Sequence, residues 1–193
     1  LGLYNLWYKE KGMSDFSFYN DNRDWLQLDK AGHIVSTYHI GYISIQTLKW
    51  AGLDSKKASI QGGISSLVYM TGIEIMDGFA DEYGFSYGDA LANAIGIGAL
   101  ITQEFLWNDQ KIRFKHSYFP SQYSKYRPEL LGNNYIQGSL KDYNGITFWM
   151  SYNLESFLNT GYLPKCLNIA LGYSGDGLLG GSENPKYNNQ NIE

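Results

Sequence analysis

The chain has 193 residues, a formal net charge of −4 and a pI near 5.4. This length suits one well-buried core, with room for an appended subdomain. The acidic balance argues against nucleic acid as the main partner, because no basic stripe exists to neutralise phosphates. The single cysteine, Cys166, excludes an internal disulfide and any site built from several cysteines.

Aromatic residues make up 16% of the chain, with 17 Tyr, while charged residues make up only 18%. Ordinary soluble domains carry roughly 25% charged residues. Tyr and Trp favour surfaces with one apolar and one wet side, including membrane interfaces. The composition therefore fits a Tyr-rich soluble fold and a membrane-associated protein equally well.

The N-terminal stretch LGLYNLWYKEKG resembles the end of an apolar helix, and no signal peptide is visible in it. A turn-rich aromatic loop follows over residues 12–28. Three long helices are then predicted, at 29–51, 55–79 and 86–107. Gly52 suits the end of the first helix, Asp54 or Ser55 the start of the second, and Ser86 with Asp89 the start of the third.

The helices have central segments without Asp, Glu, Lys or Arg, at 31–48, 58–73 and 90–103. Small residues that could allow close helix approach are Gly62, Gly63 and the four-residue series Ala90, Ala94 and Gly98. Polar residues still interrupt the apolar runs, which is atypical of the roughly 20 apolar residues of a membrane span. We therefore expect a tight soluble or membrane-apposed bundle, with three membrane-spanning helices as the alternative.

Beyond residue 109 the helical period disappears, and two segments alternate strictly between apolar and polar residues. They are GITFWMSYNL, at 145–154, and LNIALGY, at 167–173, and both predict strands. The expected fold is mainly α, an antiparallel bundle of three to four long helices with a C-terminal β-strand appendage. The expected divisions are a helical bundle at 1–109, an aromatic-rich loop and β-strand region at 110–175, and a disordered polar tail at 176–193.

Up-down-up connections between neighbouring helices would bring the head of the first, the end of the second and the head of the third to one end of the bundle. Residues i, i+3 and i+4 share a helix face. A polar cluster is therefore predicted there from Asp29, Lys30, His33, Glu74, Asp77, Asp89 and Asn93.

The predicted cluster has three interpretations. In the first, the cluster is a buried ion-pair network that fixes helix register, with Lys30 paired to Glu74 or Asp77. Alternatively it is a catalytic or metal site, with candidates His33, Glu74, Asp77 and Asp89. The third interpretation is a ligand or lipid-headgroup site without chemistry. His39 lies about 240° around the helix from His33 and should not share the site. No di-iron motif, nucleophile elbow or phosphate loop is present, so no cofactor is expected.

Several motifs together resemble an uncharacterised cell-envelope family of Bacteroidota that is similar to the YfiM lipoprotein-like proteins. They are LWYKE, NDNRDWLQLDKAGH, GIEIMDGFADEYGFSYGDALANAIGIGAL, LKDYNGITFWMSYNL and LNIALGYSGDGLLGG. A more distant resemblance is to VanZ-like membrane proteins, through Asp29, Lys30, His33, Glu74, Asp89 and Asn93. The VanZ-like pattern also has an Arg between its Glu and Asp, and residues 79–88 contain none. The resemblance implies an envelope location and a helical core.

The sequence leaves three candidate functions. The first is a non-enzymatic envelope protein at the outer membrane or its periplasmic face, an accessory subunit of an outer-membrane assembly whose partner is an outer-membrane protein or lipid. The second is a hydrolase acting on a lipid or phosphate-containing envelope substrate, with His33 as the base and Lys30 steadying an anion. The third is an integral VanZ-like helical membrane protein.

Overall fold

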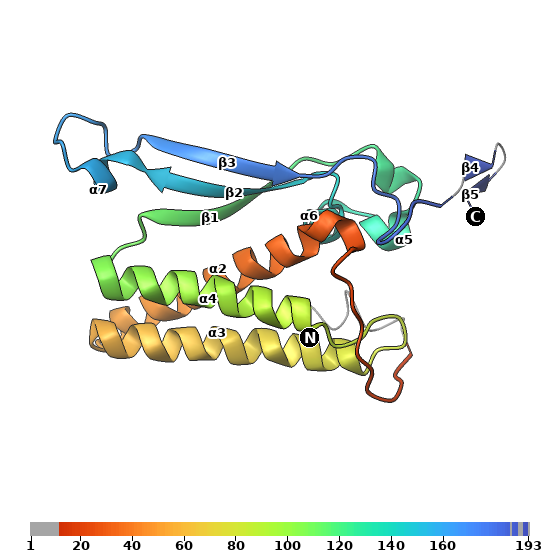
Figure 1. Cartoon of the computed structure of the whole chain (residues 1–193), viewed down its shortest axis with the longest axis horizontal. Coiled ribbons are helices and arrows are strands. Elements are labelled where there is room, and N and C mark those ends of the chain that lie inside the picture. The colour runs from red at the N-terminus through yellow and green to blue at the C-terminus, as the bar shows by residue number, and fades with distance from the viewer. Residues whose placement is uncertain (1–11, 186, 189–190, 193) are drawn as a thin grey trace.

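The computed structural model describes residues 12–185, 187–188 and 191–192, and it places a helical layer beneath a small sheet (Figure 1). A short 3-10 helix, η1 (Asp24–Gln27), precedes the three long helices α2 (Leu28–Trp50), α3 (Ser55–Gly78) and α4 (Tyr87–Trp107). The prediction of a mainly helical bundle followed by strands is confirmed, with three long helices in the described part of the chain. The helix end expected at residues 1–8 lies outside the described residues.

The predicted capping residues set the limits of the helices. Gly52 adopts a φ of 92°, which a side chain would disfavour, directly after α2 ends. The Asp54 carboxylate accepts hydrogen bonds from the backbone N–H groups of Lys56 and Lys57 at the start of α3. The Ser86 hydroxyl accepts one from the backbone N–H of Asp89 at 3.1 Å, at the start of α4. Of the two candidates for the α3 cap, Asp54 is therefore the one used.

Two glycines let the three helices approach closely. A Cβ on Gly62 would lie 2.7 Å from the backbone nitrogen of Ile45, and one on Gly96 would lie 2.4 Å from the carbonyl oxygen of Ile34. The core between the helices contains Tyr38, Ile45, Ile97 and Leu100. The predicted small-residue series does not have this role, since Ala94 and Gly98 are exposed and a Cβ on Gly98 would meet nothing within 4 Å.

The sheet has three antiparallel strands in the order β1 (Ile112–Tyr118), β2 (Ile146–Asn153) and β3 (Asn168–Ser174). In its register Met150 lies between Phe114 and Leu171. The expectation of only two strands was wrong, because β1 lies in the segment read as aromatic loop. Ile112, Phe114 and Tyr118 alternate with polar residues as in a strand, but His116 breaks the apolar series. The chain between and after these strands forms short helices, namely η2 (Tyr123–Lys125), α5 (Pro128–Leu131), α6 (Tyr135–Lys141) and α7 (Leu154–Leu158).

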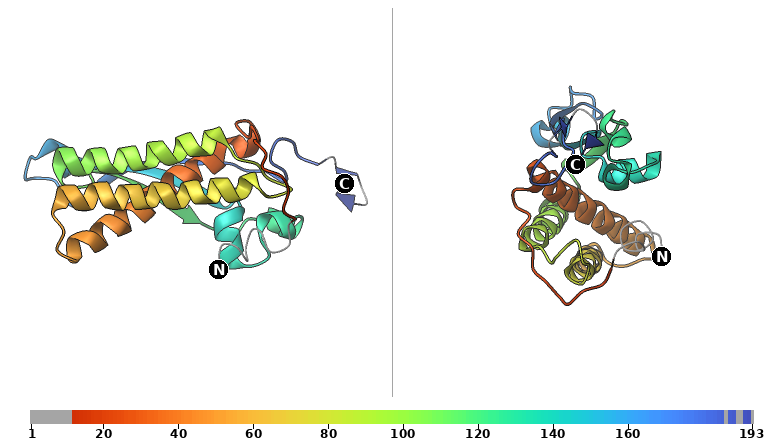
Figure 2. Two further views of the ribbon diagram at one scale, coloured as in Figure 1. Left: turned by 90° about the horizontal axis from the view of Figure 1, so that it is seen from below. Right: turned by 90° about the vertical axis from the view of Figure 1, so that its right-hand side faces the viewer.

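The sheet lies alongside α2, and the views in Figure 2 show it on one side of the bundle only. The Phe114 ring packs edge-on against Tyr38 with 5.3 Å between centroids. Strand β3 forms an edge of the sheet, and all of its residues are exposed. The order of strands therefore leaves β2 central and β1 closest to the helices.

The segment after β3 folds back onto the junction between the two layers. The side chain of Asn144 accepts a hydrogen bond from the Leu178 backbone N–H at 2.6 Å and donates one to its carbonyl at 2.9 Å. The backbone N–H of Trp25 donates to the Gly181 carbonyl at 2.8 Å. Residues 176–185 of the tail expected to be disordered thus have defined contacts. Beyond them, β4 (Tyr187–Asn188) pairs with β5 (Asn191–Ile192), and residues 186, 189–190 and 193 lie outside the described part.

The side of α3 and α4 away from the sheet is apolar and exposed to solvent. Between residues 58 and 76 of α3, and between 90 and 107 of α4, no exposed residue is Asp, Glu, Lys or Arg. We call this surface the outer face; its large exposed apolar side chains are Ile60, Ile64, Val68, Tyr69, Ile75 and Met76 of α3, and Leu91, Ile95, Phe105 and Leu106 of α4. Among the described residues, α4 alone is long and apolar enough to cross a membrane by length and composition.

Candidate functional site

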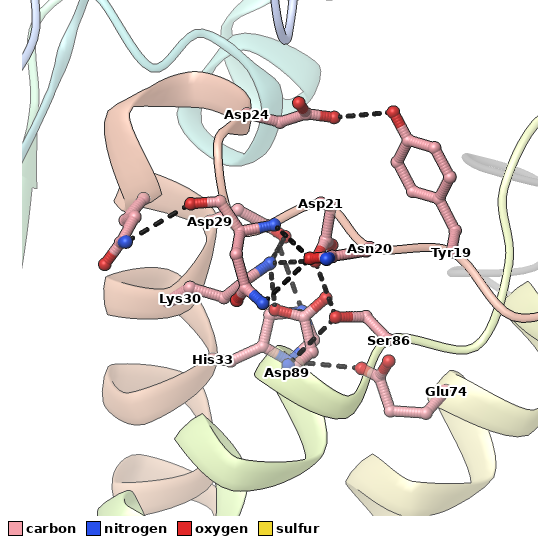
Figure 3. A network of polar contacts seen from close by, with 12 residues as sticks. Tyr19, Asn20, Asp21, Asp24, Asp29, Lys30, His33, Glu74, Ser86 and Asp89 are labelled. Atoms are coloured by element: carbon pink, nitrogen blue, oxygen red, sulfur yellow. Dashed lines mark hydrogen bonds and ion pairs between the residues drawn. The ribbon is translucent and has the colours of Figure 1, made fainter.

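The polar residues of the three helices meet at one end of the bundle, where α2 begins, α3 ends and α4 begins (Figure 3). His33 Nδ1 lies 3.3 Å from Glu74 Oε1 of α3 and 3.1 Å from Asn93 Oδ1 of α4. His33 Nε2 lies 3.8 Å from Asp29 Oδ1 and 3.9 Å from Asp89 Oδ1. The structure therefore brings Asp29, His33, Glu74, Asp89 and Asn93 together around a single imidazole.

Lys30 has a different set of partners from the one predicted. Its ammonium group lies 2.7 Å from Asp21 Oδ1, 2.8 Å from Asp89 Oδ1 and 3.4 Å from Asp29 Oδ2. The prediction of a pair with Glu74 or Asp77 was wrong, because Lys30 leaves α2 towards α4 and the preceding loop, whereas His33 occupies the side facing Glu74. Burial works to lower the pKa of Lys30, but its hydrogen bonds to Asp21 and Asp89 outweigh burial and raise the pKa above its usual range.

His33 is held by acceptors on one side of its ring. Since Nδ1 faces the oxygens of Glu74 and Asn93, this nitrogen carries a proton, and Nε2 keeps its lone pair in the neutral ring. Burial opposes a charge on the ring. The negative charges of Asp29, Asp89 and Glu74 nevertheless prevail and raise the pKa of His33 above its usual value.

Glu74 and Asp89 are carboxylates in an environment that resists their ionisation. Burial, together with the charges of Asp89, Asp77 and Asp29, raises the pKa of Glu74 to about 8, although His33 acts in the opposite direction. Burial and the charge of Asp29 raise the pKa of Asp89 to about 7. Asp77 thus influences the cluster through its charge on Glu74. In the described part of the chain, the carboxyl groups of the site outnumber its two basic groups, Lys30 and His33.

Three buried polar atoms of the cluster make no hydrogen bond. They are Glu74 Oε1, Asp89 Oδ1 and Asn93 Nδ2, and the three residues are 1%, 4% and 0% exposed. Asp89 Oδ1 has the ion pair with Lys30, but Glu74 Oε1 has only its approach to His33. Buried polar atoms without hydrogen bonds are rare in native proteins and call for an explanation.

Sequence reasoning missed several residues that complete the cluster. The Tyr143 hydroxyl, just before β2, donates a 2.7 Å hydrogen bond to Asp29 Oδ1, and Asp21 receives one from Ser86 at 2.6 Å. Asp21 was read as turn chemistry, and Tyr143 lies in a segment with no helical period. The Thr37 hydroxyl, one turn after His33, lies 2.7 Å from Asn93 Oδ1. Its four-residue spacing from His33 was the one signal available in the sequence.

Other candidate positions lie elsewhere. His39 is half-buried against β1, where burial and His116 lower its pKa, so the prediction that it does not share the site with His33 is confirmed. Two surface hollows have different linings: one includes Tyr118 and Pro128, and the other Arg113 and Lys165. Neither contains a residue of the polar cluster, in which Asp29 has the most exposed side chain of the groups around His33.

Comparison with known proteins gives one match. Residues 15–103 match the model of the family DUF2279, described as a predicted periplasmic lipoprotein. No curated protein and no solved structure matches the chain. The matched segment contains α2, α3 and all but the last turn of α4, together with every cluster residue except Tyr143. Over residues 15–103, a little under half of its length, the chain is thus similar to a family of predicted periplasmic lipoproteins of the cell envelope.

Proposed function

We propose that this is a non-enzymatic envelope protein that seats the outer face of α3 and α4 in the periplasmic leaflet of the outer membrane, as an accessory of an outer-membrane assembly. The proposal rests on one observation: no exposed residue of that face is Asp, Glu, Lys or Arg. Val68 is 66% exposed and Leu91 is 63% exposed, and no element of the described part of the chain covers them. Large exposed apolar surfaces on soluble domains mark binding sites for proteins or membranes.

The ends of the outer face have the composition of a membrane interface. At one end Trp50 is 89% exposed, next to the exposed Lys56 and Lys57. At the other end Tyr87 is 67% exposed and Phe79 is 40% exposed. Aromatic rings favour the headgroup region, and lysines there attract anionic lipids. These features support lipid rather than a soluble protein as the occupant of the face.

The position of the sheet favours helices that lie in the plane of the membrane. The strands run alongside the helices, so helices crossing the bilayer would carry the strands to the same depth (Figure 1). The edge strand β3 would then expose unpaired backbone groups to lipid, which is prohibitively unfavourable. With the axes of α3 and α4 parallel to the surface, the apolar residues enter the leaflet and the sheet stays in water. This orientation supports the first function over an integral VanZ-like protein.

Vesicle flotation of the 193-residue chain without any lipid anchor tests the proposal. The chain should float with vesicles of phosphatidylethanolamine and phosphatidylglycerol, and Val68→Glu should abolish flotation, because it places a charge in the leaflet. Leu171→Glu is the matched control: Leu171 is 61% exposed on β3, so this variant should float normally.

Three outcomes would contradict the proposal. They are failure of the unchanged chain to float, equal flotation of Val68→Glu, and loss of flotation in Leu171→Glu alone. In cells, sucrose-gradient fractionation should place the protein with the outer membrane. Recovery with the inner membrane would favour the VanZ-like alternative.

A second candidate, a hydrolase at the polar cluster, is supported by one observation. His33 Nε2 faces two carboxylates, while Nδ1 lies against Glu74 and Asn93, so the neutral ring would present Nε2 as a general base. Complementation of a deletion strain tests it. If folded His33→Ala and Glu74→Ala variants restore the phenotype fully, catalysis at this cluster is ruled out.

A further inference from the structure

The space in front of His33 Nε2 has the dimensions of a metal site. Two atoms bound to one ion at about 2.1 Å cannot lie more than about 4.2 Å apart. The distances from His33 Nε2 to Asp29 Oδ1 and to Asp89 Oδ1 are 3.8 Å and 3.9 Å, which meet this limit. They exceed the 2.7–3.2 Å of a direct hydrogen bond, so neither carboxylate holds the ring itself. One donor atom from each of the three residues lies within 4.8 Å of the others.

The surrounding residues orient all three donors. The Tyr143 hydroxyl donates to Asp29 Oδ1 at 2.7 Å, and Asn93 Oδ1 lies 3.1 Å from His33 Nδ1, which leaves Nε2 to face the two carboxylates. Metal-binding histidines usually donate their other ring N–H to a carboxylate or carbonyl oxygen in this way. Glu74 Oε1, 3.3 Å from the same nitrogen, supplies such a carboxylate.

The buried carboxylates of the cluster have few donors. Glu74 Oε1 accepts no hydrogen bond, and Asp89 Oδ1 has only its 2.8 Å ion pair with Lys30, although these residues are 1% and 4% exposed. Among the described residues, Asp21, Asp29 and Asp89 share the cation of Lys30, while Glu74 faces His33. Leaving buried charge uncompensated is costly, and a divalent ion would compensate it.

We propose that Asp29, His33 and Asp89 bind a divalent first-row transition metal such as Zn²⁺. One imidazole nitrogen and two carboxylate oxygens suit such ions, whereas Mg²⁺ and Ca²⁺ prefer oxygen alone. Lys30 keeps its 2.7 Å pair with Asp21 when Asp89 binds the ion. The site ties α2 to α4, and it stands whether or not the outer face binds lipid.

Equilibrium dialysis of the chelator-stripped 193-residue chain against Zn²⁺ tests the site. One Zn²⁺ should bind per chain, and His33→Gln should weaken binding by more than about 100-fold, since even outer partners of a metal site contribute 10–100-fold. Asp29→Asn is the second variant, because its partly exposed side chain keeps an oxygen for Tyr143. It should weaken Zn²⁺ binding while preserving the far-UV circular dichroism spectrum.

His39→Gln is the matched control, because His39 lies on the same helix but faces His116 and β1. It should bind Zn²⁺ like the unchanged chain. The proposal is overturned if the unchanged chain binds no Zn²⁺, if His39→Gln removes the binding, or if folded Asp29→Asn retains full affinity. Stabilisation gives a second readout: Zn²⁺ should raise the Tm of the unchanged chain and of His39→Gln, but not that of Asp29→Asn.

Discussion

Tyr143 donates a 2.7 Å hydrogen bond to Asp29, across 114 positions of sequence, and thereby joins the connection before β2 to the first turn of α2. Tyr143 is partly buried, and its desolvation together with the charge of Asp29 raises its pKa well above the usual value. The hydroxyl is therefore protonated at every physiological pH and serves only as a donor. This bond is a direct link between the sheet layer and the polar cluster.

Tyr143→Phe should destabilise the fold by about 1–2 kcal/mol, because a partly buried hydrogen bond to a charged group is lost and the Asp29 oxygen is left without this donor. Urea unfolding followed by tryptophan fluorescence measures the change. Tyr162→Phe is the control, since Tyr162 is 92% exposed, and it should change the midpoint little. Equal urea midpoints for the two variants would show that this hydrogen bond makes no net contribution to the free energy of unfolding.

Gly96→Ala and Gly98→Ala form a matched pair on α4. The new Cβ at position 96 would lie 2.4 Å from the Ile34 carbonyl oxygen, so α2 and α4 must separate. We expect a loss of about 1–3 kcal/mol, as for other overpacked cores. At position 98 the Cβ meets nothing within 4 Å, and the variant should gain up to about 1 kcal/mol from helix propensity. Thermal unfolding measures the Tm of both variants. A Tm change of the same sign in both would contradict this packing.

Lys30→Met should be strongly destabilising, because it leaves Asp21 and Asp89 without their shared cation in a largely buried site. Removing one partner of a buried ion pair typically costs about 3–5 kcal/mol. Lys56→Met, at an exposed position, should remain within about 0.5 kcal/mol of the unchanged chain. Chemical unfolding at pH 7 gives both values, and a similar small change in both would mean that Lys30 is not needed for the network.

Glu74→Gln should make stability less dependent on pH. The folded-state pKa of Glu74, about 8, is above the ordinary 4.5, so the folded chain holds this proton more tightly than the unfolded chain. Its contribution is fully present below pH 4.5 and is lost as pH rises towards 8. With chelator present, the variant should match the unchanged chain near pH 4.5 and exceed its Tm at pH 8. The same Tm difference at both pH values would contradict a raised pKa.

The helices and their ends could be predicted because their signals are local: capping residues, Gly52 and charge-free central segments. The convergence of His33 with Glu74 and Asp89 followed from the alternating direction of the helices. The partners of Lys30 could not be predicted, since they depend on how α2 is rotated and on where the preceding loop places Asp21. Strand β1 was missed because a strand is stabilised by partners distant in sequence, and its own pattern contained Arg113, Lys115 and His116.

The segment that carries Leu178 belongs to no strand, yet both of its backbone hydrogen bonds go to Asn144, the neighbour of Tyr143. Tension on the C-terminal part of the chain would therefore be transmitted first to this junction and then to Asp29. A chain that ends at residue 175 would keep every charged group of the polar cluster. It would lose the two hydrogen bonds between Leu178 and Asn144, and with them the contact of the C-terminal segment beside Tyr143.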